Sequence, residues 1–420
     1  MALQTAFTIN SNELFDSIGN MIISQRVWDN PIGKRQTLVD SARVDGSKFG
    51  DTRLHYDTDV LKSHKWGVDA DHPKGGNAYV EAANLLAVDP AQDPIVQAIV
   101  LDNFRQIRLT TETIISARAW MDEYGLSQFW SRMVAWMRDT KAMYESRMFQ
   151  SYIGTAETNV GKQLQKIDLS SVIAEATTKE EANRLEASAI GLFLANLFVE
   201  MGDYSRDFND NGTMKSFSVD QIKVVFNANY LNKIQKVLLP TIFNKDGVID
   251  KLNSDLMPAR YFGNVLTADN LATYAASTAY SAGDYLYNGT DGKYYQVTED
   301  ITSANNTAFT DVKTKGVTVR SLIETDYKVS TTDYYVYPAD EIAVGATIGT
   351  GGTFAYGECY AEDNSIMAKI YVKTPELISS FETASEFFNP RSNTTNRYIT
   401  WGFNTLEYFK AYPFITVKVE

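Results

Sequence analysis

The sequence has few of the side chains that most often carry chemistry. Its 420 residues include a single cysteine, Cys359, and three histidines. One cysteine excludes an intrachain disulfide bond and any cluster of thiolates within one chain. Reduced, intracellular synthesis is the simplest expectation. Because no histidine lies near Cys359 in the sequence, a buried thiol is favoured there over a nucleophile.

Long apolar runs are also missing. The most apolar segment, 189–199, is about eleven residues long and contains Asn196, whereas a bilayer-spanning helix needs roughly 20 apolar residues. The first fifteen residues, MALQTAFTINSNELF, have neither the cationic nor the apolar segment of a secretory signal. We therefore expect no secretory signal and no membrane partner.

Positive charge is in deficit. Lysine and arginine total 39 against 52 aspartate and glutamate residues, which gives a net charge of -13 and a pI of about 4.9. Such a chain gains little from releasing counterions on a phosphate backbone, so a dedicated nucleic-acid binder is disfavoured. A protein that surrounds nucleic acid without binding it specifically is compatible with this charge.

Apolar and aromatic residues are abundant by comparison. Hydrophobic residues make up 44% of the chain and 24 residues are tyrosine. A chain of this length and composition is expected to form two or three domains with large cores. Much of the tyrosine lies in the last third, which favours strands there.

The longest helical pattern covers residues 126–152, which include neither glycine nor proline. Its large apolar residues recur at steps of three and four: Leu126, Phe129, Trp130, Met133, Val134, Met137, Tyr144, Met148 and Tyr152. This spacing predicts a long helix whose single apolar stripe lies on a layer. Trp136 is off the stripe, so we expect a second neighbour to cover it. The longest core helix of an ordinary globular domain explains the periodicity equally well.

The flanking segments have weaker patterns. Asn10 and Glu13 resemble a capping pair for an amphipathic helix that docks either on its own domain or on a neighbouring subunit. Residues 50–88 alternate only at 52–60, which predicts a strand before an open tip. A segment from Ile95 reads as β-structure, and a helix from Thr111 or Glu112 is expected to break at Gly125.

The second half alternates strands and helices before it becomes rich in strands. Thr178 and Glu181 form a capping box for a helix expected to be buried on most sides at 192–199. Further expected elements, in chain order, are strands at 221–227 and 261–266, a helix at 230–239 between them, and strands at 334–337, 366–372, 398–403 and 414–419. This order indicates an α+β protein with a mixed middle region.

Motifs for catalysis or metal binding are weak. His55, His64 and His72 lie near Asp57, Asp59, Asp69 and Asp71. His55 and Asp57 share one face of the expected strand, so a metal site is conceivable, but scattered solvated histidines explain the spacing better. The GTGG segment at 349–352 matches no phosphate-binding motif. No carboxylate pair stands out as acid and base, so we expect no enzyme, cofactor or metal site.

Across most of its length, the chain resembles the major capsid proteins of tailed bacteriophages, which have the Hong Kong 97-type fold. The resemblance lies in the order of the segments and in the closing residues RYITWGFNTLEYFKAYPFITVKVE, where an aromatic–glycine pair precedes a last strand. The domains that it implies are an N-terminal arm (1–48), an extended β-hairpin loop that overlaps a neighbouring subunit (49–88), a peripheral domain (89–166) with a spine helix on a sheet (126–152), an axial α/β domain (167–378) with a small all-β insertion (277–312), and C-terminal strands that close the peripheral and axial core (379–420).

The insertion resembles small carbohydrate-binding modules of the chitin-binding type. The matching residues are Tyr280, Ser281, Gly283, Asp284, Tyr285, Tyr287, Gly292, Lys293, Tyr294 and Tyr295. Such modules usually finish with a tryptophan, whereas AFTDV stands here. Five tyrosines are candidates for carbohydrate or other surface contact: Tyr280, Tyr285, Tyr287, Tyr294 and Tyr295. Packing within a small sheet explains their spacing as well, and is the favoured interpretation.

The capsid resemblance implies a structural protein that self-assembles, as hexamers and pentamers, into the icosahedral or prolate head shell of a phage. The shell would enclose double-stranded DNA without binding it specifically. Portal, scaffolding and decoration proteins are the other implied partners. The implied location is the virion capsid, assembled in the host cytoplasm. The alternative is a carbohydrate- or receptor-binding virion protein.

Overall fold

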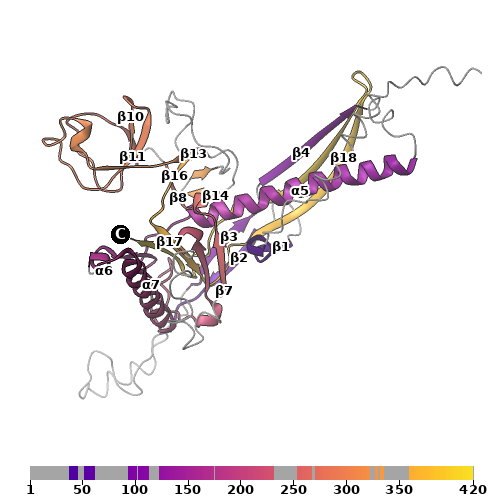
Figure 1. The fold of residues 1–420 in the computed structure, drawn as a ribbon. Coiled ribbons are helices and arrows are strands. Elements are labelled where there is room, and N and C mark those ends of the chain that lie inside the picture. Colours follow the sequence, from indigo (N-terminus) through magenta and orange to yellow (C-terminus); the bar gives the residue numbers. More distant parts are fainter. Residues whose placement is uncertain are drawn as a thin grey trace, which may run out of the picture.

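A computed structural model gives the fold of the chain (Figure 1). It describes residues 37–45, 52–61, 93–101, 103–112, 123–174, 176–230, 253–266, 270–321, 327–329, 332–334 and 359–419. These residues form several sheets and few helices, as expected for the α+β class. Several predicted features lie outside the described residues: the arm helix capped by Asn10, the loop tip with His64 and His72, and the GTGG segment. The predicted helix at 230–239 and the predicted strand at 334–337 lie outside them beyond their first residues.

One long helix, α5 (Glu123–Thr155), is the stiff element of the molecule. Its 33 residues give a length of about 50 Å at 1.5 Å per residue. The predicted helix at 126–152 is therefore confirmed, with a further turn. Gly125 was expected to break the helix before it, and this was wrong. Gly125 lies in the first turn of α5, and the cost of glycine there, about 1 kcal/mol at most, is small against the packing of a long helix.

A four-stranded sheet runs beside α5, with the order β1-β18-β19-β4 (Figure 1). Its strands are β1 (Arg43–Asp45), β4 (Asn103–Glu112), β18 (Leu377–Asn389) and β19 (Thr394–Phe403). Tyr144 of α5 lies edge-on to Trp401 and Phe403 of β19, with ring centroids 6.0 and 6.4 Å apart. The expected helix start at Thr111 or Glu112 was wrong, because both residues pair with β19 as the end of β4.

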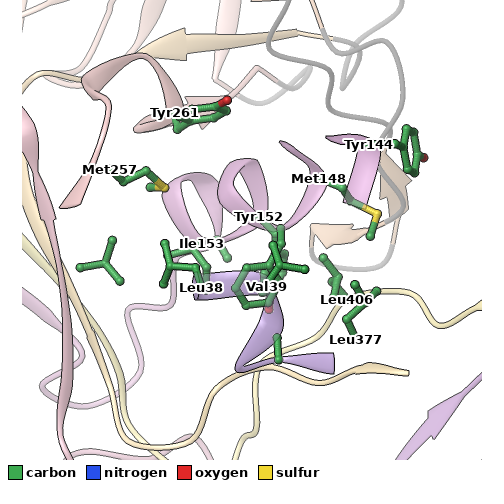
Figure 2. Packing of buried hydrophobic residues seen from close by; sticks show 14 of the residues in the cluster. Leu38, Val39, Tyr144, Met148, Tyr152, Ile153, Met257, Tyr261, Leu377 and Leu406 are labelled. Carbon is green, nitrogen blue, oxygen red and sulfur yellow. The ribbon is translucent and has the colours of Figure 1, made fainter. Parts of the chain in front are cut away.

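A short helix, α2 (Thr37–Asp40), fastens the start of the described chain to α5. Leu38 and Val39 lie beside Tyr152 and Ile153 in the core (Figure 2). Just beyond α2, Arg43 donates two hydrogen bonds to Oε2 of Glu145, at 2.7 and 3.2 Å. Because Glu145 is buried, this pair adds to the ion pair of Glu145 with Lys141 on the same helix, at 3.9 Å, in satisfying a charge in the interior.

A five-stranded sheet forms the second layer, in the order β5-β20-β17-β6-β7. Its strands are β5 (Leu164–Ile167), β6 (Lys223–Asn227), β7 (Asn253–Met257), β17 (Ile366–Tyr371) and β20 (Phe414–Val419). The central strand β17 is buried along its whole length. Residues of one face join the core around the end of α5, and residues of the other join the core beneath α7. A strand covered on both faces has no side that meets water, which explains why all its residues except Lys369 are apolar or aromatic.

The helix on the far side of that sheet is α7 (Lys179–Gly202), preceded by the single-turn helix α6 (Ser170–Ala174). The predicted capping signal is confirmed: the Thr178 hydroxyl accepts a hydrogen bond from the Glu181 amide. The prediction that 192–199 is buried on most sides was wrong, since Leu192 is 65% and Val199 is 75% exposed. The sheet covers one face of α7, and no other described element covers the opposite face. By length and composition α7 is apolar enough to cross a membrane, yet its inner face belongs to the core of this sheet.

A small β-unit is inserted in a three-stranded sheet of order β13-β16-β8. The sheet consists of β8 (Gly263–Val265), β13 (Val319–Ser321) and β16 (Cys359–Glu362). Between β8 and β13 come β9 (Leu271–Thr273), β10 (Tyr285–Asn288), β11 (Lys293–Val297) and β12 (Thr314–Gly316), which pair in the order β12-β11-β10-β9. The unit extends beyond the expected 277–312 and projects from the body (Figure 1). A separate hairpin, β14 (Tyr327–Val329) and β15 (Thr332–Tyr334), follows.

Candidate functional site

The surface most unlike that of an ordinary monomer lies on a two-stranded ribbon. It consists of β2 (Thr52–Asp57) and β3 (Ile95–Val100), which pair antiparallel from Thr52–Val100 to Asp57–Ile95. Alternate residues of each strand point to opposite faces of the ribbon. We call the two sides the inner face and the outer face, according to whether they contact the body of the protein.

The inner face is mostly polar, except for Ile95 and for Ile99, which is buried in a small apolar cluster with Phe409, and it holds the ribbon to the body. The His55 ring lies edge-on to Phe409, with centroids 4.7 Å apart, and Arg53 forms an ion pair with Glu376 at 3.3 Å. Gln97 donates a hydrogen bond to the Tyr408 carbonyl at 2.9 Å. Burial, followed by the charge of Lys373, lowers the pKa of His55, so the imidazole is held largely neutral at pH 7.

Two carboxylates fix the root of the ribbon. Asp57 forms an ion pair with Lys215 at 2.5 Å and accepts hydrogen bonds from Asn211 and Thr213. Burial alone would raise the pKa of Asp57, but these hydrogen bonds outweigh it, and the pKa stays below its usual value. Asp59 accepts hydrogen bonds from the Met214 amide and from Arg206, which lower its pKa to about 2. Both carboxylates are therefore ionised and paired at neutral pH.

The outer face is apolar and open. Its exposed members are Thr52, Leu54, Tyr56, Val96, Ala98 and Val100. Tyr56 is 64% exposed, and Leu54 and Val96 are each 48% exposed. A half-buried sheet of a monomer normally turns its apolar side to the core and its polar side to water. The outer face of this ribbon instead exposes apolar side chains to water, and a contiguous exposed apolar face of this kind is typical of a protein–protein contact.

Two further apolar sites are exposed along the long helix and its sheet. Phe387 and Phe388 lie on β18 near the turn to β19 and are 59% and 48% exposed. Trp136 on α5 is 46% exposed, and no described element covers it as we expected a second neighbour to do. Aromatic residues are enriched at the centres of protein interfaces. These positions are further exposed apolar sites, on elements other than the ribbon.

The five candidate tyrosines lie together in the insertion, but most of them are inside it. Tyr280, Tyr285 and Tyr294 are between 3% and 6% exposed, while Tyr287 and Tyr295 are half-buried. The Tyr287 and Tyr294 rings pack with centroids 5.0 Å apart. Tyr295 donates a hydrogen bond to Asp291, which raises the pKa of the tyrosine. Buried rings cannot stack on a sugar, so this arrangement does not favour the carbohydrate-binding alternative.

The described residues contain no cluster suited to holding a metal ion: nowhere do three His, Cys, Asp or Glu side chains converge. His55 and Asp57 do share one face of β2, as expected. Their side chains turn to different partners, Phe409 and Glu376 for the imidazole and Lys215 for the carboxylate. Both are used to attach the ribbon.

Sequence reasoning predicted a strand at 52–60, which the structure shows as Thr52–Asp57, but it missed the outer face of that strand. The alternation of Leu54 and Tyr56 with Arg53, His55 and Asp57 predicts two faces without saying which one meets the body. A signal was present in the charges: a strand that carries three ionisable residues on one face offers partners for a charged protein surface. The body surface that the ribbon contacts is formed by residues 205–215 and 373–412, which lie far from β2 in the sequence.

Comparisons with known proteins find similarity only at the level of structure. No family model matches the chain, and no curated protein matches it. Among solved structures, a capsid structure of Staphylococcus phage Andhra has a TM-score of 0.49 and 10% identity, covering 93% of this chain and 85% of that chain. A structure of the head fibre and inner core protein of bacteriophage P68 has a TM-score of 0.47 and 8% identity, covering 92% and 85%.

A third structure, the asymmetric unit of the mature capsid of bacteriophage PhiM1, has a TM-score of 0.37 and 7% identity, covering 90% of this chain and 85% of that chain. All three are similar to the chain over nine-tenths of its length or more at very low identity. All three structures come from bacteriophages.

Proposed function

We propose that this chain is a major capsid protein, which self-assembles into the head shell of a tailed bacteriophage. The observation that carries the proposal is the ribbon of β2 and β3, whose inner face is fastened to the body and whose apolar outer face is open. That arrangement costs free energy in a solitary molecule, at roughly 25 cal/mol for each Å² of apolar surface left in water. A neighbouring copy that covers the outer face recovers this free energy.

The rest of the fold suits a shell subunit. A helix of about 50 Å along a twisted sheet gives a plate that keeps its shape, and exposed aromatics on α5 and β18 supply further contacts. Each contact between copies can be weak, because a closed lattice repeats it many times and each later contact forms at high effective concentration. Symmetric closure requires that every copy offer the same set of surfaces.

We extend the proposal to the partners and the location. The copies form hexamers and pentamers, and the shell encloses double-stranded DNA without specific contacts, in keeping with the net charge of -13. A portal protein, and scaffolding or decoration proteins, complete the particle. The chain acts in the virion capsid after assembly in the host cytoplasm, and it has no enzymatic role. The extended β-hairpin loop (49–88) overlaps a neighbouring subunit.

A charge placed on the outer face tests the proposal. Val96→Glu puts a carboxylate where a neighbour is expected to bury an apolar side chain, at a cost of several kcal/mol for each contact. Since 1.4 kcal/mol is a factor of ten in an equilibrium constant, we expect at least a tenfold loss of shells. Val160→Glu is the matched control, because Val160 is 46% exposed against 48% for Val96 and is not a residue of the ribbon.

Shell yield is measured by sedimentation and negative-stain electron microscopy of the expressed chain, and folding by circular dichroism. The proposal predicts shells for the unmodified chain and for Val160→Glu, and a folded, slowly assembling subunit for Val96→Glu. An unmodified chain that stays monomeric at high concentration would overturn the capsid assignment. Normal shells from Val96→Glu would leave that assignment standing and remove the ribbon from the contacts.

A further inference from the structure

The exposed side of α7 carries a heptad pattern that the capsid assignment does not explain. Large apolar residues recur every seven positions and small ones recur midway between them. The large set is Leu185, Leu192 and Val199, and the small set is Ser188, Ala195 and Gly202. Steps of four and three along this series place all six residues on one stripe. We call this stripe the α7 seam.

The seam is held rigidly and faces outward. The opposite side of α7 is buried by Ala187, Ile190, Gly191, Leu194, Leu197, Phe198 and Met201, which pack on the five-stranded sheet. On the seam, Leu192 and Val199 are 65% and 75% exposed, Leu185 is half-buried, and all three small residues are exposed. A helix with one face fixed in a core presents the other face without further ordering, so a partner is bound at little entropic cost.

We propose that the α7 seam packs antiparallel against the α7 seam of a second copy of this chain. In an antiparallel pair, one register sets every contact. The register that puts Leu192 opposite Ala195 of the other copy also puts Val199 opposite Ser188. It puts Leu185 opposite Gly202 in the same way. Every large side chain therefore meets a small one, which lets the two helices approach to the short end of the usual 8–10 Å range.

Charges at the ends of the seam agree with this register. Arg184 and Asp203 are both exposed and lie just outside its two ends. When Leu192 is opposite Ala195, Arg184 of each copy is level with Asp203 of the other. Opposite charges thus meet at both ends of the pair, while a parallel pair would place like charges together.

The size of the seam indicates a contact within a larger assembly. From Leu185 to Gly202 the stripe is about 25 Å long and about 10 Å wide, or roughly 250 Å² per copy. A stable two-body interface buries about 800 Å² per partner. The α7 pair is therefore too small to hold two free molecules together and contributes only where other contacts already bring copies close.

Acidic residues beside the seam disfavour a lipid surface as the occupant. Glu180, Glu200 and Asp203 are exposed near it, whereas helices that lie on membranes border their apolar face with lysine and arginine. In the proposed pair, Arg184 of the second copy lies level with Asp203, whereas an anionic membrane offers no positive charge to these carboxylates. The same chain thus fits the seam better than a membrane does.

Cysteine pairing tests the register directly. In a Cys359→Ser background, chains with Leu192→Cys and chains with Ala195→Cys are coexpressed and oxidised, and disulfide-linked dimers are measured on non-reducing gels. A disulfide needs Cα atoms roughly 4.4–6.8 Å apart. The mixture of Leu192→Cys and Ala195→Cys should therefore crosslink at least tenfold more than a control mixture of Leu192→Cys and Asn183→Cys, because Asn183 lies off the seam. A mixture of Val199→Cys and Ser188→Cys should crosslink as well.

The outcomes separate this inference from the proposed function. Shells without crosslinks in either seam mixture would overturn the α7 pair and leave the capsid proposal intact. Crosslinked dimers that never form shells would support the pair and count against the capsid. Equal crosslinking with Asn183→Cys would overturn the register. If the unmodified chain floats with vesicles of phosphatidylcholine and phosphatidylglycerol, and Leu192→Asp abolishes this flotation, then a lipid surface and not a second copy occupies the seam.

Discussion

Lys369 is a lysine whose amino group lies in the core of the five-stranded sheet. Its Nζ donates hydrogen bonds to the Ala156 carbonyl and the Thr416 hydroxyl, both at 2.8 Å, and the residue is 0% exposed. Burial lowers the pKa of Lys369 to about 8, against the attraction of Glu157. The two hydrogen bonds join the end of α5 to β17 and β20, so the lysine fastens the long helix to the second layer.

The lowered pKa predicts how stability changes with pH. Between the folded pKa of about 8 and the unfolded value near 10.4, the unfolded chain binds more protons, so this group makes unfolding harder as pH rises. Relative to Lys369→Met, the free energy of unfolding of the unmodified chain should increase by about 2 to 3 kcal/mol from pH 7 to pH 10. Denaturant titrations of both proteins at each pH measure the difference. A difference that stays constant with pH would contradict the lowered pKa.

The sequence shows Lys369 but not its burial. A lysine within the apolar run Ile366–Tyr371 reads as a residue on the polar side of a strand, since lysine is almost never fully buried without a partner. The partners here are a carbonyl at the end of a helix more than two hundred residues away and a hydroxyl on the last strand. Contacts between such distant segments depend on the tertiary fold, and no local pattern encodes them.

The chain leaves the body for the insertion after β8 and returns to the body at β13, in the same three-stranded sheet. β8 and β13 both pair with β16 and run in the same direction on its two sides. The unit has its own small core of Tyr280, Leu286, Val297 and Val312. A second cluster joins Tyr285 and Tyr294 to Leu266, Val319 and Ala361 of the body. The three-stranded sheet β13-β16-β8 therefore keeps all its strands without the insertion, although the insertion covers part of that sheet.

Removing the insertion should leave the subunit able to fold and assemble. Replacing 271–316 with a six-residue glycine–serine linker keeps β8, β13 and β16, and exposes the apolar residues that Tyr285 and Tyr294 cover. We expect a loss of about 2 to 4 kcal/mol in unfolding free energy, comparable to truncating buried aromatic side chains, and shells of unchanged diameter by electron microscopy. Tyr287→Ala with Tyr295→Ala is the milder control. Shells of altered size would mean that the insertion takes part in the lattice.

Local signals predicted some elements well and others poorly. The apolar spacing in 126–152 and the Thr178–Glu181 capping pair identified α5 and α7, because both signals lie within a few turns of one helix. The last residues of β4, Thr111 and Glu112, were predicted to start a helix. Polar residues occur at the ends of both long edge strands and helices, so the local sequence did not distinguish the two. The exposure of Leu192 was missed for a different reason: hydrophobicity predicts burial and does not say whether the cover belongs to the same chain.

At the scale of the whole molecule, the described surface has apolar contact faces on a body of high negative charge. The ribbon and the α7 seam lie on different layers, one beside the long helix and the other beyond the five-stranded sheet (Figure 1). The α7 seam is too small to hold a free pair of molecules together. Assembly then depends on the balance between many small apolar contacts and the mutual repulsion of copies that each carry a net charge of -13.

This balance predicts that salt promotes assembly. The screening length falls from about 10 Å at 0.1 M to about 3 Å at 1 M ionic strength, which weakens repulsion between neighbouring copies and leaves apolar contacts intact. We expect the subunit concentration needed for shells to fall at least tenfold between 0.05 and 1 M sodium chloride, as measured by light scattering. Magnesium chloride at matched ionic strength is the control for specific cation binding. If salt instead dissolves the shells, ion pairs hold the copies together, and the apolar faces of the ribbon and of α7 are not the main contacts.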